Sequence, residues 1–377
     1  MSAFTKVLHS SAEYSTIKNA IKNSFLPMGI IGLSPVHKAH YISSLAEEFE
    51  KKVLIICEDE AHASKLVEDL NQFAKGAFLY PTRDFHFDIS ETRSKEFEQQ
   101  RLGVLRRMLD GDFNFVVASV ESASQFTISR DELHKRSISL VNGEEYEMKQ
   151  VVDTLVGAGF VRMENVDGVG QFAVRGDILD VFSAHLKHPI RIEFWDNTID
   201  SIAFFDIETQ RRFEPEDKVT ITPSTDILFD SNQDLKEKLE DFVKTVSGKG
   251  SVKAKKSINE DIDKLEHGVN VSSLDRYLSL AYDKLETIFD YSDDCLVFVC
   301  ESANTKQRYN SSNTLFLQDL NLMVELGHIT RGLDKFTLTW EEILKQYETR
   351  KAIFVDNLAR GSFDIPVREL VSVSAGI

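Results

Sequence analysis

Apolar and polar residues alternate almost without a break from residue 171 to residue 206, with interruptions at residues 175–177 and 183–189. Side chains two residues apart in a strand lie on the same side, so this period predicts strands with one buried face. The interruptions fit the turns of a small antiparallel sheet. A short helix expected near residues 148–156, ending at Gly157 and Gly159, precedes this sheet.

The last of these strands divides its side chains between the two faces of the predicted sheet. Its apolar face comprises Ile190, Ile192 and Phe194. Its outer face comprises Arg191, Glu193 and Trp195. A tryptophan in a core is easily explained, whereas one on an outer face is not. Because Trp and Arg are the residues that most often anchor interfaces, this face is a candidate binding surface.

Strands alternate with helices in the first 135 or so residues. The continuous apolar runs at residues 53–57 and 115–120 are typical of strands buried in a parallel sheet. Residues 38–50 place an apolar residue at every third or fourth position, which predicts an amphipathic helix. A similar apolar run at residues 296–300 could complete the same sheet. This order predicts a doubly wound α/β domain interrupted by the antiparallel one.

The expected fold class is therefore α/β, with a parallel-sheet domain, an inserted α+β domain and a small C-terminal unit. The predicted boundaries are 1–138 and 227–330 for the two parts of the α/β domain, 139–226 for the insertion and 331–377 for the last unit. Because the chain has neither a signal peptide nor a run of about 18 apolar residues, no membrane association is expected. We expect the chain to be part of a longer protein.

Composition narrows the function. The net charge of −17 argues against a general nucleic-acid binder, because neutralising phosphates requires clustered Lys and Arg. The lysine-rich residues 247–256 are expected to form a solvated, flexible connection, with direct DNA contact as the alternative. Three scattered cysteines are too few for a disulfide framework or a zinc site, so no metal site is expected and a reducing cytoplasm is the simplest location.

The turn after the first strand lies where a phosphate-binding loop would be, but the formula of such a loop is only partly present. Gly32 and Lys38 occupy the positions of the first glycine and the lysine. His37 replaces the second glycine, and Ala39 replaces the hydroxyl residue that would bind magnesium. Pro35 removes one amide donor. An ordinary strand-to-helix turn is the favoured interpretation, with weak anion binding near Lys38 as the alternative.

The strand at residues 296–300 lacks the acidic pair that would hold a metal ion in a nucleotidase. It ends at Cys300 and Glu301. No Ser-His-Asp or Cys-His arrangement can be argued from spacing either. We therefore predict no catalytic residues in this chain.

One family resembles this sequence closely. The segments QFAVRGDILDVF and HPIRIEFWDNTIDSIAFFDIETQRR resemble the second domain of UvrB and the matching module of Mfd, the transcription-repair coupling factor. The likeness covers roughly residues 20–305. UvrB has an intact phosphate loop and a tyrosine-rich hairpin, whereas this chain has the degenerate loop and passes from Tyr80-Pro81 directly to DFHFDIS. The chain therefore resembles the N-terminal UvrB-homology region of Mfd.

The resemblance implies a non-catalytic module that recruits UvrA, the damage-recognition protein of nucleotide excision repair. Arg175 and Arg191 would pair with acidic groups of UvrA, Trp195 would be the apolar anchor, and Glu193 would orient Arg191. The resemblance also implies that this surface is covered in the resting full-length protein. The parent would use ATP and Mg²⁺ in a separate DNA-translocating motor that displaces stalled RNA polymerase, and this chain would need no cofactor. The alternative is an active UvrB-type ATPase, against which His37, Ala39 and Cys300 stand.

Overall fold

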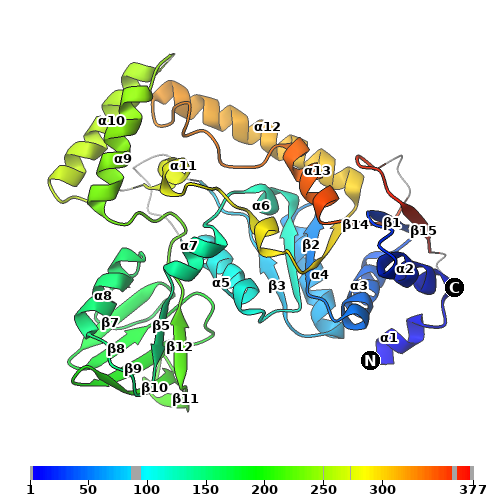
Figure 1. The fold of residues 1–377 in the computed structure, drawn as a ribbon, viewed down its shortest axis with the longest axis horizontal. Coiled ribbons are helices and arrows are strands. Elements are labelled where there is room, and N and C mark those ends of the chain that lie inside the picture. The colour runs from blue at the N-terminus through cyan, green and yellow to red at the C-terminus, as the bar shows by residue number, and fades with distance from the viewer. Residues whose placement is uncertain (1–2, 86–94, 249, 272, 359–362, 374–377) are drawn as a thin grey trace.

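A computed structural model of the chain describes residues 3–85, 95–248, 250–271, 273–358 and 363–373. It has a large parallel sheet and a separate antiparallel domain, which lies below the α9–α10 helices in Figure 1. The fold class is thus confirmed as mixed α/β, with an inserted unit that carries an antiparallel sheet. None of the helices in the described ranges combines the length and the apolar character that a bilayer crossing requires.

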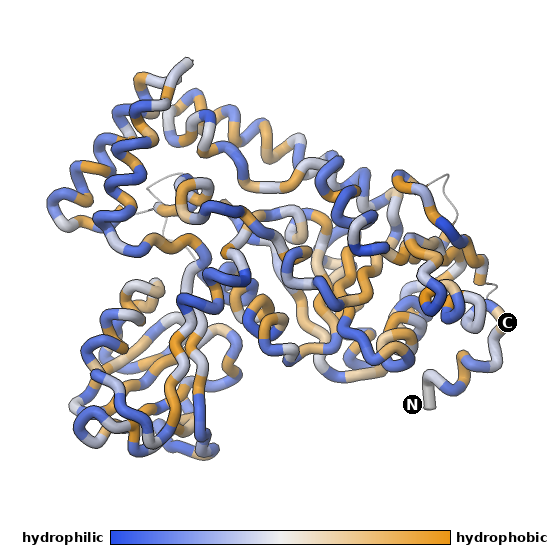
Figure 2. Tube along the Cα trace, in the orientation of Figure 1, coloured by the Kyte–Doolittle hydropathy of each residue, from blue (hydrophilic) through white to orange (hydrophobic). Residues whose placement is uncertain are grey.

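The large sheet has seven strands in the order β15-β1-β14-β13-β2-β4-β3, and all neighbouring pairs are parallel. The strands are β1 (Met28–Ile31), β2 (Val53–Cys57), β3 (Ala77–Tyr80), β4 (Phe115–Ser119), β13 (Leu296–Cys300), β14 (Ile353–Asp356) and β15 (Glu369–Ser372). The apolar runs that predicted parallel strands are confirmed as β2, β4 and β13. Figure 2 shows apolar residues concentrated on these strands.

Helices cover both faces of this sheet, and the strands alternate between the two cores. On β2, Val53 and Ile55 face one core, whereas Leu54 and Ile56 face the other. The first core is covered by α1 (Ala3–Leu8), α2 (Ala12–Lys22), α3 (Pro35–Phe49) and α4 (Glu60–Phe73). The second core is covered by α5 (Glu96–Asp110), α6 (Val120–Ser124), α7 (Arg130–Lys135), α9 (Asn232–Thr245), α10 (Ser251–Glu266), α11 (Leu278–Ala281), α12 (Ser302–Leu326) and α13 (Trp340–Thr349).

The C-terminal segment corrects one expectation. We predicted a small additional unit over residues 331–377, but β14 lies between β1 and β13 in the middle of the large sheet. All four of its residues, Ile353–Asp356, are buried. A short apolar strand cannot pack as a unit of its own, and here it fills a place between strands that are distant in sequence.

The lysine-rich stretch is a second correction. From Ser251 onward it forms the first turns of α10, not a flexible connection. Four residues at helical spacing face α9 and the neighbouring core: Ala254, Ile258, Ile262 and Leu265. This stripe stabilises the helix, because the apolar face is buried while Lys253 and Lys256 stay exposed on the other side of the helix. Lys249 lies outside the described residues.

The inserted domain consists of a six-stranded sheet, a two-stranded antiparallel sheet and one helix. A six-stranded sheet has the order β11-β10-β9-β8-β7-β6, with only β6 and β7 parallel. Its strands are β6 (Val161–Arg162), β7 (Gln171–Arg175), β8 (Ile178–Val181), β9 (Ile190–Trp195), β10 (Thr198–Phe205) and β11 (Arg212–Pro215). A second pair, β5 (Ile138–Val141) and β12 (Lys218–Ile221), and the helix α8 (Met148–Gly157) cover its inner face.

Candidate partner-binding site

The outer face of the six-stranded sheet gathers the polar residues predicted from alternation. On β9, Ile190, Ile192 and Phe194 are buried in the core of the inserted domain, as expected. The alternate residues of β9, Arg191, Glu193 and Trp195, point outward, and Asp180 of β8 pairs with Arg191 across the two strands. On the next strand, Ala173 pairs with Asp180. The outer face is therefore centred on an aspartate.

Asp180 binds both predicted arginines. Arg175 donates from Nη2 to its carboxylate over 2.6 Å, and Arg191 donates from Nε and Nη2 over 2.7 Å and 2.8 Å. The Asp180 side chain is 1% exposed, whereas the Arg191 and Arg175 side chains are 12% and 42% exposed. A buried carboxylate between two guanidinium groups is compensated by their charge and hydrogen bonds. The arginines thus make intradomain ion pairs in the isolated chain.

Arg191 is held by further contacts. Its Nη1 and Nη2 donate to the backbone oxygen and the side-chain Oε1 of Gln210 over 3.2 Å and 3.0 Å. Its guanidinium lies 4.4 Å from the ring centroid of Phe205. The hydrogen bond to Asp180 raises the pKa of Arg191, so the side chain stays charged. Arg191 is therefore a fixed cation, and only part of it reaches solvent.

Glu193 does not take the predicted role. Its carboxylate accepts from Nη1 of Arg212 over 2.7 Å and from Oγ of Ser201 over 2.9 Å. Asp180 and Gln210 orient Arg191 instead. The correction follows from the register, because Ser201 pairs with Glu193 across the strands, and Arg212 lies on β11 beyond β10. Arg212 is 43% exposed and adds a third guanidinium to this face.

Trp195 is the most exposed feature of the face. Its relative exposure is 80%, so the side chain projects into solvent. It is the last residue of β9 and pairs with Thr198 at the start of β10. Asp196, which begins the turn between them, has φ 58°, a conformation that Asp tolerates better than most residues. A large exposed aromatic side chain on a short, tight hairpin is a well-positioned anchor for a partner.

The degenerate loop at residues 32–39 runs from the end of β1 into α3 in the structure. Gly32 has φ 98°, and a Cβ there would lie 2.2 Å from the carbonyl oxygen of Val373, so glycine is required by packing against the chain after β15. Pro35 is at the first position of α3, and Lys38 is buried. The ammonium group of Lys38 pairs with the carboxylate of Glu301, which also accepts from the backbone nitrogen of Asn357 over 3.0 Å. The lysine is therefore already neutralised.

This ion pair lines a pocket of about 270 Å³ at the carboxyl ends of the strands. His37 and Ala39 belong to α3, and Ala39 is fully buried. Cys300 and Cys57 reach the pocket together with the acidic Glu58 and the basic Lys65. Among the residues that the structure describes, no group of three or more His, Cys, Asp or Glu side chains is placed to hold a metal ion.

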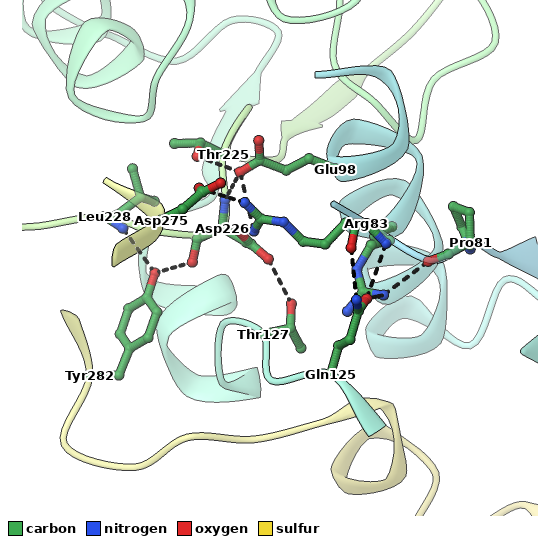
Figure 3. Close-up of polar contacts among 11 residues, drawn as sticks. Pro81, Arg83, Glu98, Gln125, Thr127, Thr225, Asp226, Leu228, Asp275 and Tyr282 are labelled. Atoms are coloured by element: carbon green, nitrogen blue, oxygen red, sulfur yellow. Dashed lines mark hydrogen bonds and ion pairs between the residues drawn. The ribbon is translucent and has the colours of Figure 1, made fainter. Parts of the chain in front are cut away.

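A buried polar network joins the inserted domain to the large sheet (Figure 3). Arg83 is buried in this network and binds the carboxylates of Asp226 and Asp275, the latter over 2.7 Å. Glu98 of α5 accepts from Oγ1 of Thr225 over 2.6 Å and from the backbone nitrogen of Asp226 over 2.9 Å. Because Thr225 and Asp226 are on the segment that returns from the inserted domain, this network fixes where that domain is attached.

The helix α5 adds contacts of its own to the inserted domain. Gln99 donates to Oγ of Ser224 over 3.1 Å, and Arg107 donates to the carbonyl oxygen of His185 over 2.8 Å. Burial lowers the pKa of His185 to about 4, so its ring is neutral near pH 7. One helix of the α/β domain thus contacts both the return segment and the β8–β9 loop.

Sequence reasoning missed three residues of the outer face: Asp180, Gln210 and Arg212. The sequence does contain a signal for Asp180, because this aspartate interrupts the apolar strand ILDV at a position that alternation assigns to the outer side. Gln210 and Arg212 lie in the turn after β10 and on β11, and the pairing of these strands decides which residues they contact. The period of a single strand does not specify how strands pair.

Comparison with known proteins agrees with this architecture. A family model described as the UvrB interaction domain matches residues 138–226. The chain is 26% identical over 97% of its length to the transcription-repair-coupling factor of Bacillus subtilis (strain 168), of which it covers 32%. It is 27% identical over 79% of its length to that of Staphylococcus aureus (strain bovine RF122 / ET3-1), of which it covers 26%.

The chain spans about a third or less of these relatives. The matched range 138–226 begins with β5 and ends just after β12, so it coincides with the inserted domain. The remaining similarity extends over the parallel-sheet domain. The chain is therefore similar over most of its length to transcription-repair-coupling factors, and its inserted domain, residues 138–226, matches the family of the UvrB interaction domain.

Proposed function

We propose that the outer face of the six-stranded sheet binds UvrA and so recruits it to the parent protein. The observation that carries the proposal is Trp195, 80% exposed at the tip of a hairpin in a domain matched by the UvrB interaction family. An exposed tryptophan on the same sheet face as three guanidinium groups, those of Arg175, Arg191 and Arg212, has the composition of an interface hot spot. The acidic charge of the rest of the chain makes this local cationic group distinctive.

The contacts suggest separate roles for the residues of this face. Arg175 and Arg212 are the half-exposed cations, and they would meet acidic groups of UvrA bidentately. Arg191 is mostly buried, so it would support the surface more than contact the partner. Asp180 holds Arg175 and Arg191 in place before binding, which lowers the entropy lost when the complex forms.

This module acts without nucleotide in the proposed function. The ion pair between Lys38 and Glu301 supports that reading, because a lysine that cradles phosphate must be free to meet it. ATP and Mg²⁺ would serve only a motor elsewhere in the parent. RNA polymerase and DNA would be bound by other parts of that parent, in the cytoplasm, where nucleotide excision repair takes place.

The test is a calorimetric titration of the full chain with purified UvrA. We expect binding to the unmodified chain and a loss of about 2 kcal/mol, roughly thirty-fold in Kd, for Trp195→Ala. Phe213→Ala is a matched control, because Phe213 is also exposed but stacks on Phe204 beside the inner core. Equal affinity of the Trp195 variant and the unmodified chain, with both folded, would refute the proposal.

A further inference from the structure

Cys57 and Cys300 lie side by side at the carboxyl ends of adjacent strands. Val299 of β13 pairs with Ile56 of β2, and each cysteine is the next residue on its strand. Both side chains belong to the same core, so they point to the same face of the sheet. Their thiols lie close enough for each to shift the pKa of the other. Two neighbouring thiols on adjacent strands form a dithiol.

The dithiol borders the pocket that contains the Lys38–Glu301 ion pair. The neighbouring Cys57 thiol lowers the pKa of Cys300, and the nearby charge of Lys38 acts in the same direction. The pKa of Cys57 is raised by the Cys300 thiol and by burial. One sulfur is thus favoured as the thiolate and its neighbour as the thiol, which is the division of roles that disulfide formation requires.

We propose that Cys57 and Cys300 form a redox-sensitive dithiol, which closes to a disulfide bond when hydrogen peroxide enters the pocket. The pocket of about 270 Å³ has room for this small oxidant. Neighbouring strands lie about 4.8 Å apart. That spacing is within the Cα separation of about 4.4–6.8 Å that disulfides span. The strands therefore need no large movement.

The reaction proceeds in two steps that balance. The Cys300 thiolate attacks one oxygen of the peroxide, the O–O bond breaks, and a sulfenic acid and hydroxide form. The Cys57 sulfur then attacks the sulfenic sulfur, and the S–O bond breaks as the disulfide forms. The protons of the two thiols and the displaced oxygens leave as two molecules of water, so two thiols and one peroxide give one disulfide.

We expect the disulfide bond to change the structure only around the pocket. Glu301 follows Cys300 directly and is the partner of Lys38, so a bond between the sulfurs would shift the carboxylate that neutralises this lysine. The UvrA-binding face is on a different sheet, which separates this inference from the proposed function.

The experiment exposes the folded full chain to hydrogen peroxide, then alkylates free thiols under denaturing conditions and maps the peptides by mass spectrometry. We expect a linked peptide pair containing Cys57 and Cys300 that is released by dithiothreitol. Cys295 is the internal control, because it is less buried than the other two and lies before β13. It should remain alkylated in the monomeric fraction.

Two variants make the result decisive. Cys295→Ala should retain the link, whereas Cys57→Ala should lose it and leave a sulfenic acid on Cys300 that dimedone traps. Full alkylation of Cys57 and Cys300 throughout a peroxide titration, even at the higher doses that oxidise Cys295, would overturn the proposal. A link from Cys295 to either residue would overturn it equally. Circular dichroism of each variant establishes that the chain is folded before treatment.

Discussion

Asp180 lies directly opposite Arg191 on neighbouring strands, and the same carboxylate binds Arg175 on the other side. One aspartate with 1% of its side chain exposed thus connects three strands on the outer face of the inserted sheet. Arg175 and Arg191, which the sequence predicts as partner contacts, are thus held side by side by the Asp180 carboxylate. Asp180 therefore links the stability of this sheet to the arrangement of the proposed binding face.

Asp180→Asn should destabilise the chain by about 1–3 kcal/mol, because the amide removes the charge that compensates two guanidinium groups. Urea unfolding followed by circular dichroism measures this change. Asp200→Asn is the control, since Asp200 is exposed on β10 of the same sheet and its substitution should change the free energy of unfolding by less than about 0.5 kcal/mol. Equal urea midpoints for Asp180→Asn and Asp200→Asn would show that the Asp180 carboxylate does not contribute to the stability of the folded chain.

Arg212→Ala should slow the association of UvrA and weaken its dependence on salt, because a half-exposed charge at the rim of a surface acts mainly through steering. The dissociation rate should change little. Surface plasmon resonance at two salt concentrations separates the two rates. Arg162→Ala provides the comparison, since Arg162 is exposed on β6 at the opposite edge of the sheet. An unchanged association rate for Arg212→Ala would remove Arg212 from the proposed site.

The elements that sequence predicted well are those whose signal is local. Alternation in residues 171–206 predicted β7 to β10, and the inward set of β9 is buried as expected. Continuous apolar runs predicted β2, β4 and β13 in one parallel sheet. In each case the face that a side chain occupies follows from the period of the backbone, which is fixed by geometry.

The elements that sequence missed depend on distant partners. β14 has only four residues, and its place between β1 and β13 is decided by segments far away in the chain. The helix α10 was not predicted, because the clustered lysines of its first turns dominate the local sequence, whereas its buried stripe extends beyond them to Leu265. The partner of Glu193 depends on the pairing of β10 with β11, which alternation within β9 cannot specify.

Glu98→Gln should stabilise the chain at alkaline pH. Burial is the main cause that raises the pKa of Glu98 to about 7 in the folded chain, from an ordinary value of 4.5, and the neighbouring charge of Asp226 acts in the same direction against the opposing effect of Arg83. The folded chain therefore keeps a proton that the unfolded chain releases, and stability falls as the pH rises from about 4.5 to about 7. Glutamine keeps the oxygen that accepts from Thr225 and cannot ionise.

The free energy of unfolding, measured from pH 5 to pH 8, tests this expectation. The advantage of Glu98→Gln over the unmodified chain should grow across that range and level off above pH 7. Glu208→Gln, in the exposed turn between β10 and β11, should give a curve parallel to that of the unmodified chain. Parallel curves for Glu98→Gln as well would mean that Glu98 keeps its charge in the folded network with Arg83 and Asp226.

Lys38→Ala decides between the two functions that the sequence left open. In a phosphate loop this lysine contacts the phosphates, so its loss would abolish ATP turnover. Here the ammonium group is buried and paired with Glu301, and removing it would leave the carboxylate with the hydrogen bond from the backbone nitrogen of Asn357. We therefore expect ATP turnover at the background level both for the unmodified chain and for Lys38→Ala. We also expect the variant to melt at a lower temperature, because the partly buried carboxylate of Glu301 loses its counter-charge. Phosphate release and thermal unfolding measure the two quantities on the same samples.

Turnover above background that disappears in Lys38→Ala would favour a UvrB-type ATPase over the recruiting module, since a lysine used only for packing has no effect on catalysis.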